Sequence, residues 1–247
     1  MDTPQTTEFR PTFDDCPKHG RWQQNVLEDG QERWRGHCPR CRAEAATARL
    51  IERAAIPARF QDRNFENYVV ENEGQREALA IAQGYAETFA EHALRRGTCL
   101  ALVGNPGNGK THLACAIAMH VQREGHTALF LTVLEAIRKV RASWKSKGTA
   151  EDEDAVLRKL AALDLLILDE VGVQYGTEAE QTTLTEIINR RYQDCRPTIL
   201  ISNLPPVSDD PNERTLKMFL GVRAYDRLRE GGGRIVAFDW QSFRGRV

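Results

Sequence analysis

The sequence predicts an α/β protein whose central parallel sheet is covered by helices on both faces. Four short apolar runs have the length and composition of buried strands, and they lie at residues 98–103, 127–132, 163–169 and 197–202. Segments of helical character separate them, and an amphipathic helix over 75–94 precedes the first strand. Strands that alternate with helices and are apolar throughout are typical of a parallel sheet buried on both faces.

A glycine-rich loop, Gly104-Asn-Pro-Gly-Asn-Gly-Lys-Thr111, lies between the first strand and a helix expected over 111–124. A loop that folds around phosphate oxygens needs glycine where a β-carbon would block the chain or where φ is positive. We expect Lys110 to reach the β- and γ-phosphates and the Thr111 hydroxyl to bind Mg²⁺. The expected nucleotide contacts are Asn105, Pro106, Gly107, Asn108, Gly109, Lys110, Thr111 and His112. The flanking strand and helix favour an ATP or GTP site over an ordinary glycine-rich turn.

Polar residues end two of the later strands. Asp169 and Glu170 close the strand at 163–169, and Asn203 follows the strand at 197–202. The carboxyl ends of parallel strands meet at the ligand crevice of such sheets. Asp169 is therefore expected to hold Mg²⁺ through its water shell, and Glu170 to orient and polarise the attacking water. Asn203 would lie between that water and the γ-phosphate, although asparagine after a strand is also a common turn former.

Length and composition restrict the class of protein. A chain of 247 residues can hold one such domain and one smaller module. The net charge of −1 gives no overall field that attracts nucleic acid, so any such contact must be local. The sequence has no apolar run of about eighteen residues that could cross a membrane, and its first 30 residues lack the apolar core of a signal peptide. We expect a cytoplasmic protein that makes no membrane contact.

Two close pairs of metal ligands, Cys16 with His19 and Cys38 with Cys41, form a CxxH…CxxC pattern near the start of the chain. Two such pairs can complete a tetrahedron around Zn²⁺. The residues between the pairs contain too few apolar side chains to fold unaided, so the metal would supply the missing stability. We expect a structural zinc module, in which His37 is a weaker candidate ligand. Free thiols in a disordered leader are the alternative.

The boundary between module and domain is expected just before Ile56-Pro57, because a residue that precedes proline is pushed out of the helical region. Helix formers over 42–55 predict a helical connector. The expected domains are therefore residues 1–55, which contain the zinc module and connector, and residues 56–247, which contain the nucleotide-binding domain.

A helix is expected over 178–195, with one apolar face and a charged outer side. The apolar face is formed by Leu184, Ile187, Ile188 and Tyr192. The charged residues that we expect to lie elsewhere on the helix are Glu180, Glu186, Arg190 and Arg191. This pattern predicts a helix that packs on the sheet and exposes its charges.

Two groups of basic residues remain. The stretch 138–147 holds Arg138, Lys139, Arg141, Lys145 and Lys147, with Trp144 among them and no acid. Such a group could follow a single-stranded backbone and stack a base, and a solvated helix face with a buried tryptophan explains it equally well. Arg223 and Arg227 are four residues apart, on one side of a helix. Too few residues follow Asn203 for a sizeable lid, so a neighbour's arginine would have to complete the pocket.

Four segments, Pro106–Leu113, Asp164–Gly172, Ile201–Leu204 and Leu220–Leu228, together resemble the DnaC-type replicative helicase loaders. These loaders are AAA+ ATPases of the initiator clade. The closing segment Phe238–Arg244 resembles the tail of the same family, and the resemblance covers about Ile56 to Val247. It implies a P-loop AAA+ ATPase core with a reduced or absent lid and Mg²⁺-dependent ATP hydrolysis.

The resemblance also implies roles and partners. Arg223 would be the arginine finger, Arg227 would support it, and Asn203 would be the sensor. The basic stretch would face single-stranded DNA inside a helical assembly of ATP-bound copies. The chain would load a hexameric DnaB-type helicase onto single-stranded DNA and bind it through residues 1–55. There the CxxH…CxxC pattern departs from the best-known DnaC pattern and is closer to DnaI-like and phage loaders.

Two alternative functions share these motifs. A transposition helper of the IstB type has the same ATPase core and would act on duplex DNA with a transposase. The zinc module and the tail favour the loader over this helper. The second alternative is a nucleotide-gated binding adaptor with negligible turnover. The intact acid pair, Asp169 and Glu170, argues against it.

Overall fold

The computed structural model describes residues 9–42, 45, 54–144, 153–173 and 178–244. The chain divides into two compact units, a small unit over Met1–Arg49 and a large unit over Leu50–Val247. Most of the expected helical connector lies outside the described residues. Ala54 and Ile56, on either side of the expected boundary, are both buried in the core of the large unit.

The small unit is built from two β-hairpins. β1 (Phe13–Cys16) pairs antiparallel with β2 (Gly20–Gln23), and β3 (Asn25–Glu28) pairs antiparallel with β4 (Gln31–Trp34). Asn25 is buried and joins β3 to the start of the unit, because its Oδ1 accepts from the Thr12 amide at 2.6 Å. Large apolar side chains remain exposed in this unit, namely Phe13, Leu27 and Trp34. The hairpins therefore bury little apolar surface of their own.

A five-stranded parallel sheet forms the centre of the large unit. Its strands, in the spatial order β6-β7-β8-β5-β9, are β6 (Ala128–Thr132), β7 (Leu165–Val171), β8 (Thr198–Ser202), β5 (Leu100–Gly104) and β9 (Arg234–Phe238). All neighbouring strands are parallel. The prediction of a parallel α/β sheet is confirmed, and β5 to β8 correspond to the four expected strands. β9 was not expected, and it is the neighbour of the strand that carries the glycine-rich loop.

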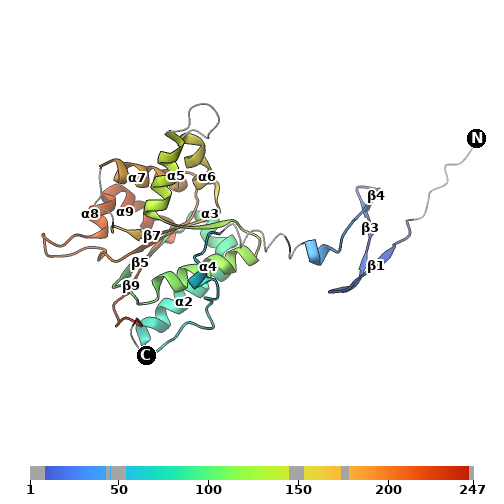
Figure 1. Ribbon diagram of the computed structural model, residues 1–247, viewed down its shortest axis with the longest axis horizontal. Helices are drawn as coiled ribbons and strands as arrows, with labels where there is room; N and C mark the ends of the chain where they lie inside the picture. Colours follow the sequence, from blue (N-terminus) through green and yellow to red (C-terminus); the bar gives the residue numbers. More distant parts are fainter. Residues whose placement is uncertain (1–8, 43–44, 46–53, 145–152, 174–177, 245–247) are drawn as a thin grey trace, which may run out of the picture. The chain divides into compact units, whose positions relative to one another are not determined.

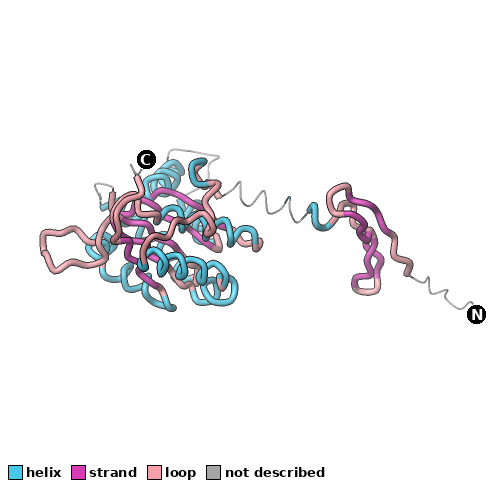
Figure 2. The backbone as a smooth tube through the Cα atoms, turned by 90° about the horizontal axis from the view of Figure 1, so that it is seen from below, coloured by secondary structure: helices cyan, strands magenta, loops and turns pink. Residues whose placement is uncertain are grey.

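Helices cover both faces of this sheet (Figures 1 and 2). One face carries α2 (Glu73–Glu87) and α4 (Lys110–Arg123). The other carries α5 (Val133–Trp144), α6 (Glu153–Ala162), α7 (Glu178–Gln193), α8 (Leu216–Leu220) and α9 (Val222–Arg229). Side chains alternate between the two faces along each strand, so Leu100 and Leu102 join the first core, and Ala101 and Val103 join the second.

Shorter helical segments complete the large unit. A 3₁₀ turn, Ala58–Phe60, precedes α2. The helix expected over 75–94 is interrupted after α2, where a π-helical turn at Phe89–Ala93 leads into the short α3 (Leu94–Arg96). A last 3₁₀ turn, Glu230–Gly232, leads into β9.

The prediction that Arg191 lies on an exposed, charged side of α7 was wrong. This side chain is fully buried and donates hydrogen bonds to the carbonyl oxygens of Leu160 at 2.6 Å, Leu163 at 2.9 Å and Pro197 at 2.6 Å. Arg191 lies seven residues after Leu184 and so shares its buried stripe, as helical spacing requires. Tyr192, expected on the apolar face, is instead 39% exposed.

We predict that Arg191→Met lowers the free energy of unfolding by about 3 kcal/mol, because it keeps the volume but leaves several buried carbonyls without a donor. Arg190→Met is the matched control. Arg190 makes ion pairs with Glu186 and Asp154 near the surface, where such pairs contribute about 1 kcal/mol or less. Urea denaturation of both variants measures the difference. Equal losses would contradict a structural role for the buried guanidinium.

Candidate functional site

The glycine-rich loop follows β5 and ends where α4 begins. Gly104, Gly107 and Gly109 have φ angles of 136°, 85° and 93°, a region that side chains disfavour. Space is also restricted. A β-carbon on Gly104 would overlap the carbonyl oxygen of Phe238, and one on Gly109 would lie 2.8 Å from Cε2 of Tyr68. Glycine is therefore required in this loop both for its backbone angles and for its size.

Lys110 lies at the first position of α4, and its ammonium group is held inside the loop. Nζ donates to the carbonyl oxygens of Gly104 at 2.6 Å and Asn105 at 2.7 Å. Burial lowers the pKa of Lys110 to about 8, although the nearby Asp169 carboxylate acts in the opposite direction. The lysine is thus a largely buried cation whose hydrogen bonds, within the part of the chain that the structure describes, go to two backbone carbonyls of the loop.

Asp169 and Thr111 come together from β7 and α4. The Thr111 hydroxyl donates to Oδ2 of Asp169 at 3.0 Å. Burial raises the pKa of Asp169, partly offset by hydrogen bonds from the Glu170 amide and the Thr111 hydroxyl. A hydroxyl and a carboxylate beside a phosphate loop are the hard oxygen donors that Mg²⁺ prefers. These two residues therefore fit a magnesium ion bound together with a nucleotide.

Glu170 lies on a bulge within β7, whereas the strand was expected to end at the acid pair. β7 continues to Val171, and its pairing with β8 shifts register between Leu168 and Val171. Glu170 has a φ of 62°, which is unusual for a residue other than glycine. Directly after the bulge, β7 is again bound to β8, because Ser202 Oγ donates to the Val171 carbonyl at 2.7 Å. Bulges beside active sites re-aim side chains, and Glu170 is exposed at the cavity described next.

A cavity of about 590 Å³ joins these residues. Its lining includes most of the glycine-rich loop, together with Asp169, Glu170 and Asn203. The structure therefore brings the predicted loop, acid pair and asparagine to one place. Within the loop, Asn108 is fully buried and its side chain is bonded elsewhere in the chain, so only its backbone is available to a ligand.

Several further residues, which no sequence pattern indicated, line the same cavity. Arg59, Arg63 and Tyr68 come from the segment before α2, and Arg244 comes from the end of the chain. Tyr68 packs edge-on against His112, with ring centroids 5.2 Å apart. Arg244 belongs to the tail segment Phe238–Arg244, which was singled out only by resemblance. The arginines add positive charge to the rim of the cavity.

The two arginines of α9 differ in their surroundings, and neither lines the cavity. Arg227 donates through Nη1 to Oδ1 of Asn189, and its guanidinium lies 4.9 Å from the centre of the Tyr192 ring. Arg227 therefore binds α7 of its own chain. Arg223 is exposed, and within the described ranges its side chain makes no hydrogen bond or ion pair.

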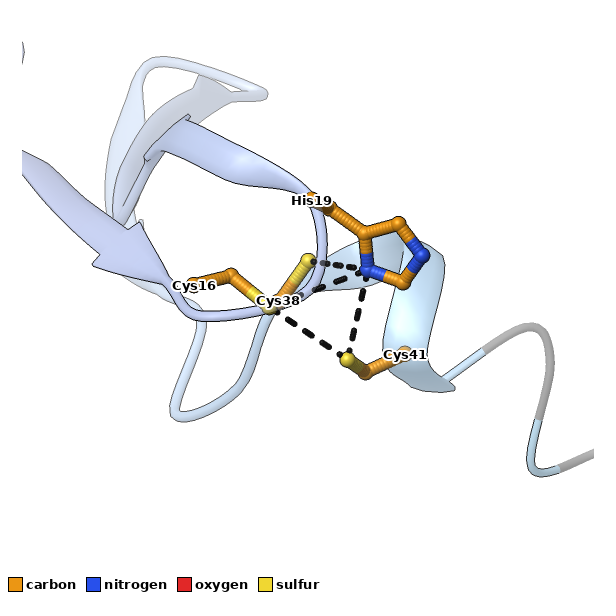
Figure 3. Close-up of side chains that lie close together, drawn as sticks. All are labelled: Cys16, His19, Cys38 and Cys41. Atoms are coloured by element: carbon orange, nitrogen blue, oxygen red, sulfur yellow. Dashed lines mark hydrogen bonds between the residues drawn. The ribbon is translucent and has the colours of Figure 1, made fainter.

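The predicted metal ligands converge in the small unit (Figure 3). The four ligand atoms of Cys16, His19, Cys38 and Cys41 lie within 4.8 Å of one another. Cys16 Sγ is 3.5 Å from Cys41 Sγ, and His19 Nδ1 is 3.3 Å from Cys41 Sγ and 3.7 Å from the other two sulfurs. A tetrahedral zinc site has ligand–ligand distances of about 3.6–3.8 Å. The donor set fits Zn²⁺, and the exposed His37 is not part of the group.

The thiols of Cys16 and Cys41 influence each other, and the hydrogen bond with Cys16 raises the pKa of Cys41 to about 11. Backbone hydrogen bonds from Lys18 and His19 lower the pKa of Cys16 to about 6. Because the thiolate is the form that binds zinc, these amides stabilise the required state. The site has four protein ligands and therefore matches a closed, structural zinc site rather than a catalytic one.

The basic stretch is only partly visible. Arg138 and Lys139 are exposed on α5, and Arg141 makes an ion pair with Glu180 at 3.7 Å. Lys145, Lys147 and the side chain of Trp144 lie outside the described residues. Among the helices that the structure describes, none has both the length and the apolar character needed to span a bilayer.

The phosphate loop follows β5 and the acid pair lies on β7, and one strand, β8, separates β5 from β7 in the sheet. This arrangement defines a P-loop nucleotide-binding domain of the AAA+ class. Solved structures agree with this fold. A crystal structure of the DnaC helicase loader aligns with a TM-score of 0.63 at 21% identity, over 74% of this chain and 100% of that one. The replication initiator DnaA bound to AMPPCP and single-stranded DNA aligns with a TM-score of 0.59 at 23% identity, over 76% and 52%.

The family follows from the sequence. Residues 40–209 match the family of IstB-like ATP binding proteins. The chain is 35% identical to the replicative helicase loader DnaC of Escherichia coli K12 over 199 residues, which are 81% of this chain and 76% of DnaC. It is 34% identical to the uncharacterized protein YdaV of the same strain over 226 residues, 92% and 85% of the two chains. The chain therefore belongs to the IstB-like ATP-binding family and is a DnaC-type AAA+ protein, which confirms the resemblance.

We predict that the purified protein binds about one zinc ion per chain and that Cys38→Ser loses it, because three ligands no longer close the tetrahedron. Elemental analysis measures the metal. Limited proteolysis should then show cleavage within residues 9–42 while the large unit stays intact. Cys195→Ser is the matched control, since Cys195 is exposed and lies outside the group. Metal-free wild-type protein with a protected small unit would rule out the site.

Proposed function

We propose that this protein is a Mg²⁺-dependent ATPase that loads a DnaB-type hexameric helicase onto single-stranded DNA. The observation that carries the proposal is the convergence of Lys110, Thr111 and the acid pair on one cavity in a chain that aligns with DnaC over 81% of its length. Such a protein would act in the cytoplasm, during replication initiation.

In the proposed ATP site, the Lys110 ammonium donates its hydrogen bonds to the β- and γ-phosphates and no longer to the loop carbonyls. This exchange is favourable because a largely buried cation replaces neutral carbonyl partners with an anionic one. Thr111 and Asp169 hold Mg²⁺, Glu170 polarises the attacking water, and Asn203 orients that water. The exposed position of Glu170 on its bulge supports this role, since the carboxylate must reach a water beyond the γ-phosphate.

We propose that Arg223 acts as the finger for a neighbouring copy. Arg223 is exposed and does not line the cavity of its own chain, which supports donation across a subunit boundary. Arg227, which the resemblance implied to lie near the finger in support, is proposed instead to hold α9 against α7. Its bond to Asn189 and its stacking on Tyr192 give it this anchoring function. ATP binding would in this way favour self-association on the helicase.

The small unit is proposed to bind the helicase. Its exposed Leu27 and Trp34 are the kind of apolar side chains that a protein partner covers. Residues 138–147 are proposed to follow single-stranded DNA, for which the exposed Arg138 and Lys139 provide local positive charge.

A second candidate is favoured by the match of residues 40–209 to the IstB-like ATP binding proteins. In that case the same ATPase would act on duplex DNA with a transposase. Capture of a purified DnaB-type helicase, but not of a transposase, by the tagged protein with MgATP would favour the loader. A nucleotide-gated adaptor with negligible turnover remains the third possibility, and the hydrolysis measurements below separate it from both.

We predict that Lys110→Ala and Glu170→Gln separate nucleotide binding from hydrolysis. Lys110→Ala should lose MgATP binding with its fold intact, because the phosphates lose their buried cation. Glu170→Gln should bind MgATP as the wild type does but hydrolyse it at least about a hundredfold more slowly, since general-base catalysis contributes about 10²–10⁴-fold. Equilibrium nucleotide titration and single-turnover hydrolysis measure the two steps. Wild-type affinity in the first variant, or wild-type turnover in the second, would refute the assigned role.

We predict that Arg223→Ala binds MgATP normally but loses the hydrolysis stimulated by helicase or DNA, by a factor on the order of a thousand. Mixing it with Lys110→Ala subunits should restore part of the activity, because the boundary between two such subunits can combine an intact loop with an intact finger. Steady-state ATP hydrolysis of the mixture measures this rescue. If both variants assemble on the helicase and no rescue occurs, the arginine does not act across the boundary.

A further inference from the structure

The glycine-rich loop is tied to the end of the chain through Asn108. This side chain is fully buried. Its Nδ2 donates to the carbonyl oxygens of Phe238 at 2.8 Å and Trp240 at 2.5 Å. In return, Nε1 of Trp240 donates to the Asn108 carbonyl at 3.0 Å. Because both acceptors of the amide group are carbonyls, only the NH₂ end can face them, and the orientation of the side chain is fixed.

A second set of contacts continues along the loop. The amide of Phe243 donates to the Gly107 carbonyl at 3.0 Å. A β-carbon on Gly107 would overlap Oγ of Ser242. The tail segment Phe238–Arg244 therefore lies directly against the loop over several residues.

The tail is itself anchored. Trp240 is 9% exposed, and its ring lies 4.8 Å from that of Phe238, at the end of β9. On its other side the indole meets the start of α2, where a β-carbon on Gly74 would lie 3.3 Å from the ring. Trp240 thus connects the tail to the sheet through β9 and to the start of α2. The loop residues that contact the tail are held by these same elements.

The direction of these hydrogen bonds matters for a ligand. The tail occupies the carbonyls of Gly107 and Asn108. The hydrogen bonds that the tail donates to the loop, from the Phe243 amide and the Trp240 indole, both go to loop carbonyls and not to loop amides. The tail therefore holds the loop from its carbonyl side, which is compatible with loop amides that face an anion, the arrangement that a phosphate requires.

We propose that Asn108 is a positioning residue for nucleotide binding, which ties the phosphate loop to the tail and keeps it in its phosphate-accepting shape. This inference rests on the ATP site proposed above. A loop without this tie would have to be ordered at the moment of binding, and that cost would appear as weaker affinity. Once the phosphates are bound, they hold the loop themselves. The effect should therefore fall on KM and on the dissociation constant more than on kcat.

Asn108→Asp tests the proposal, because it keeps the size of the side chain and turns its donor into a carboxylate oxygen that faces two carbonyls. The dissociation constant for MgATP should rise at least about tenfold, since two hydrogen bonds are lost and each contributes about 1 kcal/mol. Asn108→Ala should bind no worse than Asn108→Asp, although it creates a cavity. The kcat at saturating MgATP should change by less than about threefold, because the loop is then held by its ligand. A role in packing alone would make alanine the worse variant.

Two further variants make the test decisive. Asn212→Asp repeats the substitution at an exposed residue outside the cavity and should bind MgATP as the wild type does. Trp240→Phe keeps an aromatic ring but removes the donor to the Asn108 carbonyl, so it should weaken MgATP binding by a few-fold. If Asn108→Asp fails to fold, the MgATP affinity of Trp240→Phe tests the proposal in its place. Wild-type affinity in the folded Asn108→Asp protein, or in Trp240→Phe when the first does not fold, would overturn the proposal. Wild-type protein that binds no MgATP would instead overturn the proposed function.

Discussion

The close approach of β9 to the end of β5 is the constraint on which the rest of the site depends. The carbonyl of Phe238 lies so near Gly104 that no side chain fits between them. Parallel pairing of β5 with β9 creates this approach, and it directs the tail over the phosphate loop. The loop in turn sets the start of α4, which places Lys110 and Thr111 beside the acid of β7. The sheet order thus determines the geometry of a site whose residues are far apart in the sequence.

Burial disfavours the charged forms of two groups in the site, Lys110 and Asp169. Burial lowers the pKa of Lys110 to about 8 and raises the pKa of Asp169. The charged form of each group is therefore less stable here than in water. A nucleotide phosphate and a magnesium ion would relieve both costs, because each supplies an opposite charge inside the cavity. Arg244 adds to the strain on Lys110 and should gain from the same phosphates. The electrostatics are therefore those of a site completed by an anion together with a cation.

Local patterns in the sequence predicted the parts of the molecule that depend on local spacing. The strands β5 to β8, the phosphate loop and the group from Cys16 to Cys41 are of this kind. β9 was missed because the prediction rested on strands buried on both faces, whereas exposed and buried residues alternate along β9, and its pairing with β5 makes it part of the sheet. The buried Arg191 was misjudged because charge was given more weight than helical spacing, and its partners lie on α6 and near the start of β8. The bulge at Glu170 and the tie at Asn108 depend on neighbours from distant segments, which no local pattern reports.

The large unit brings the residues proposed to bind ATP to one cavity, whereas Arg223 is exposed and does not line that cavity. The central claim is that two copies share one site. The most direct test is the ATP turnover per chain of the wild-type protein, measured with Mg²⁺ and single-stranded DNA at fixed salt over a wide range of protein concentration. If copies complete one another's sites, turnover per chain rises with concentration and then levels off as assembly becomes complete. A turnover per chain that stays constant from dilute monomer upward would contradict the account.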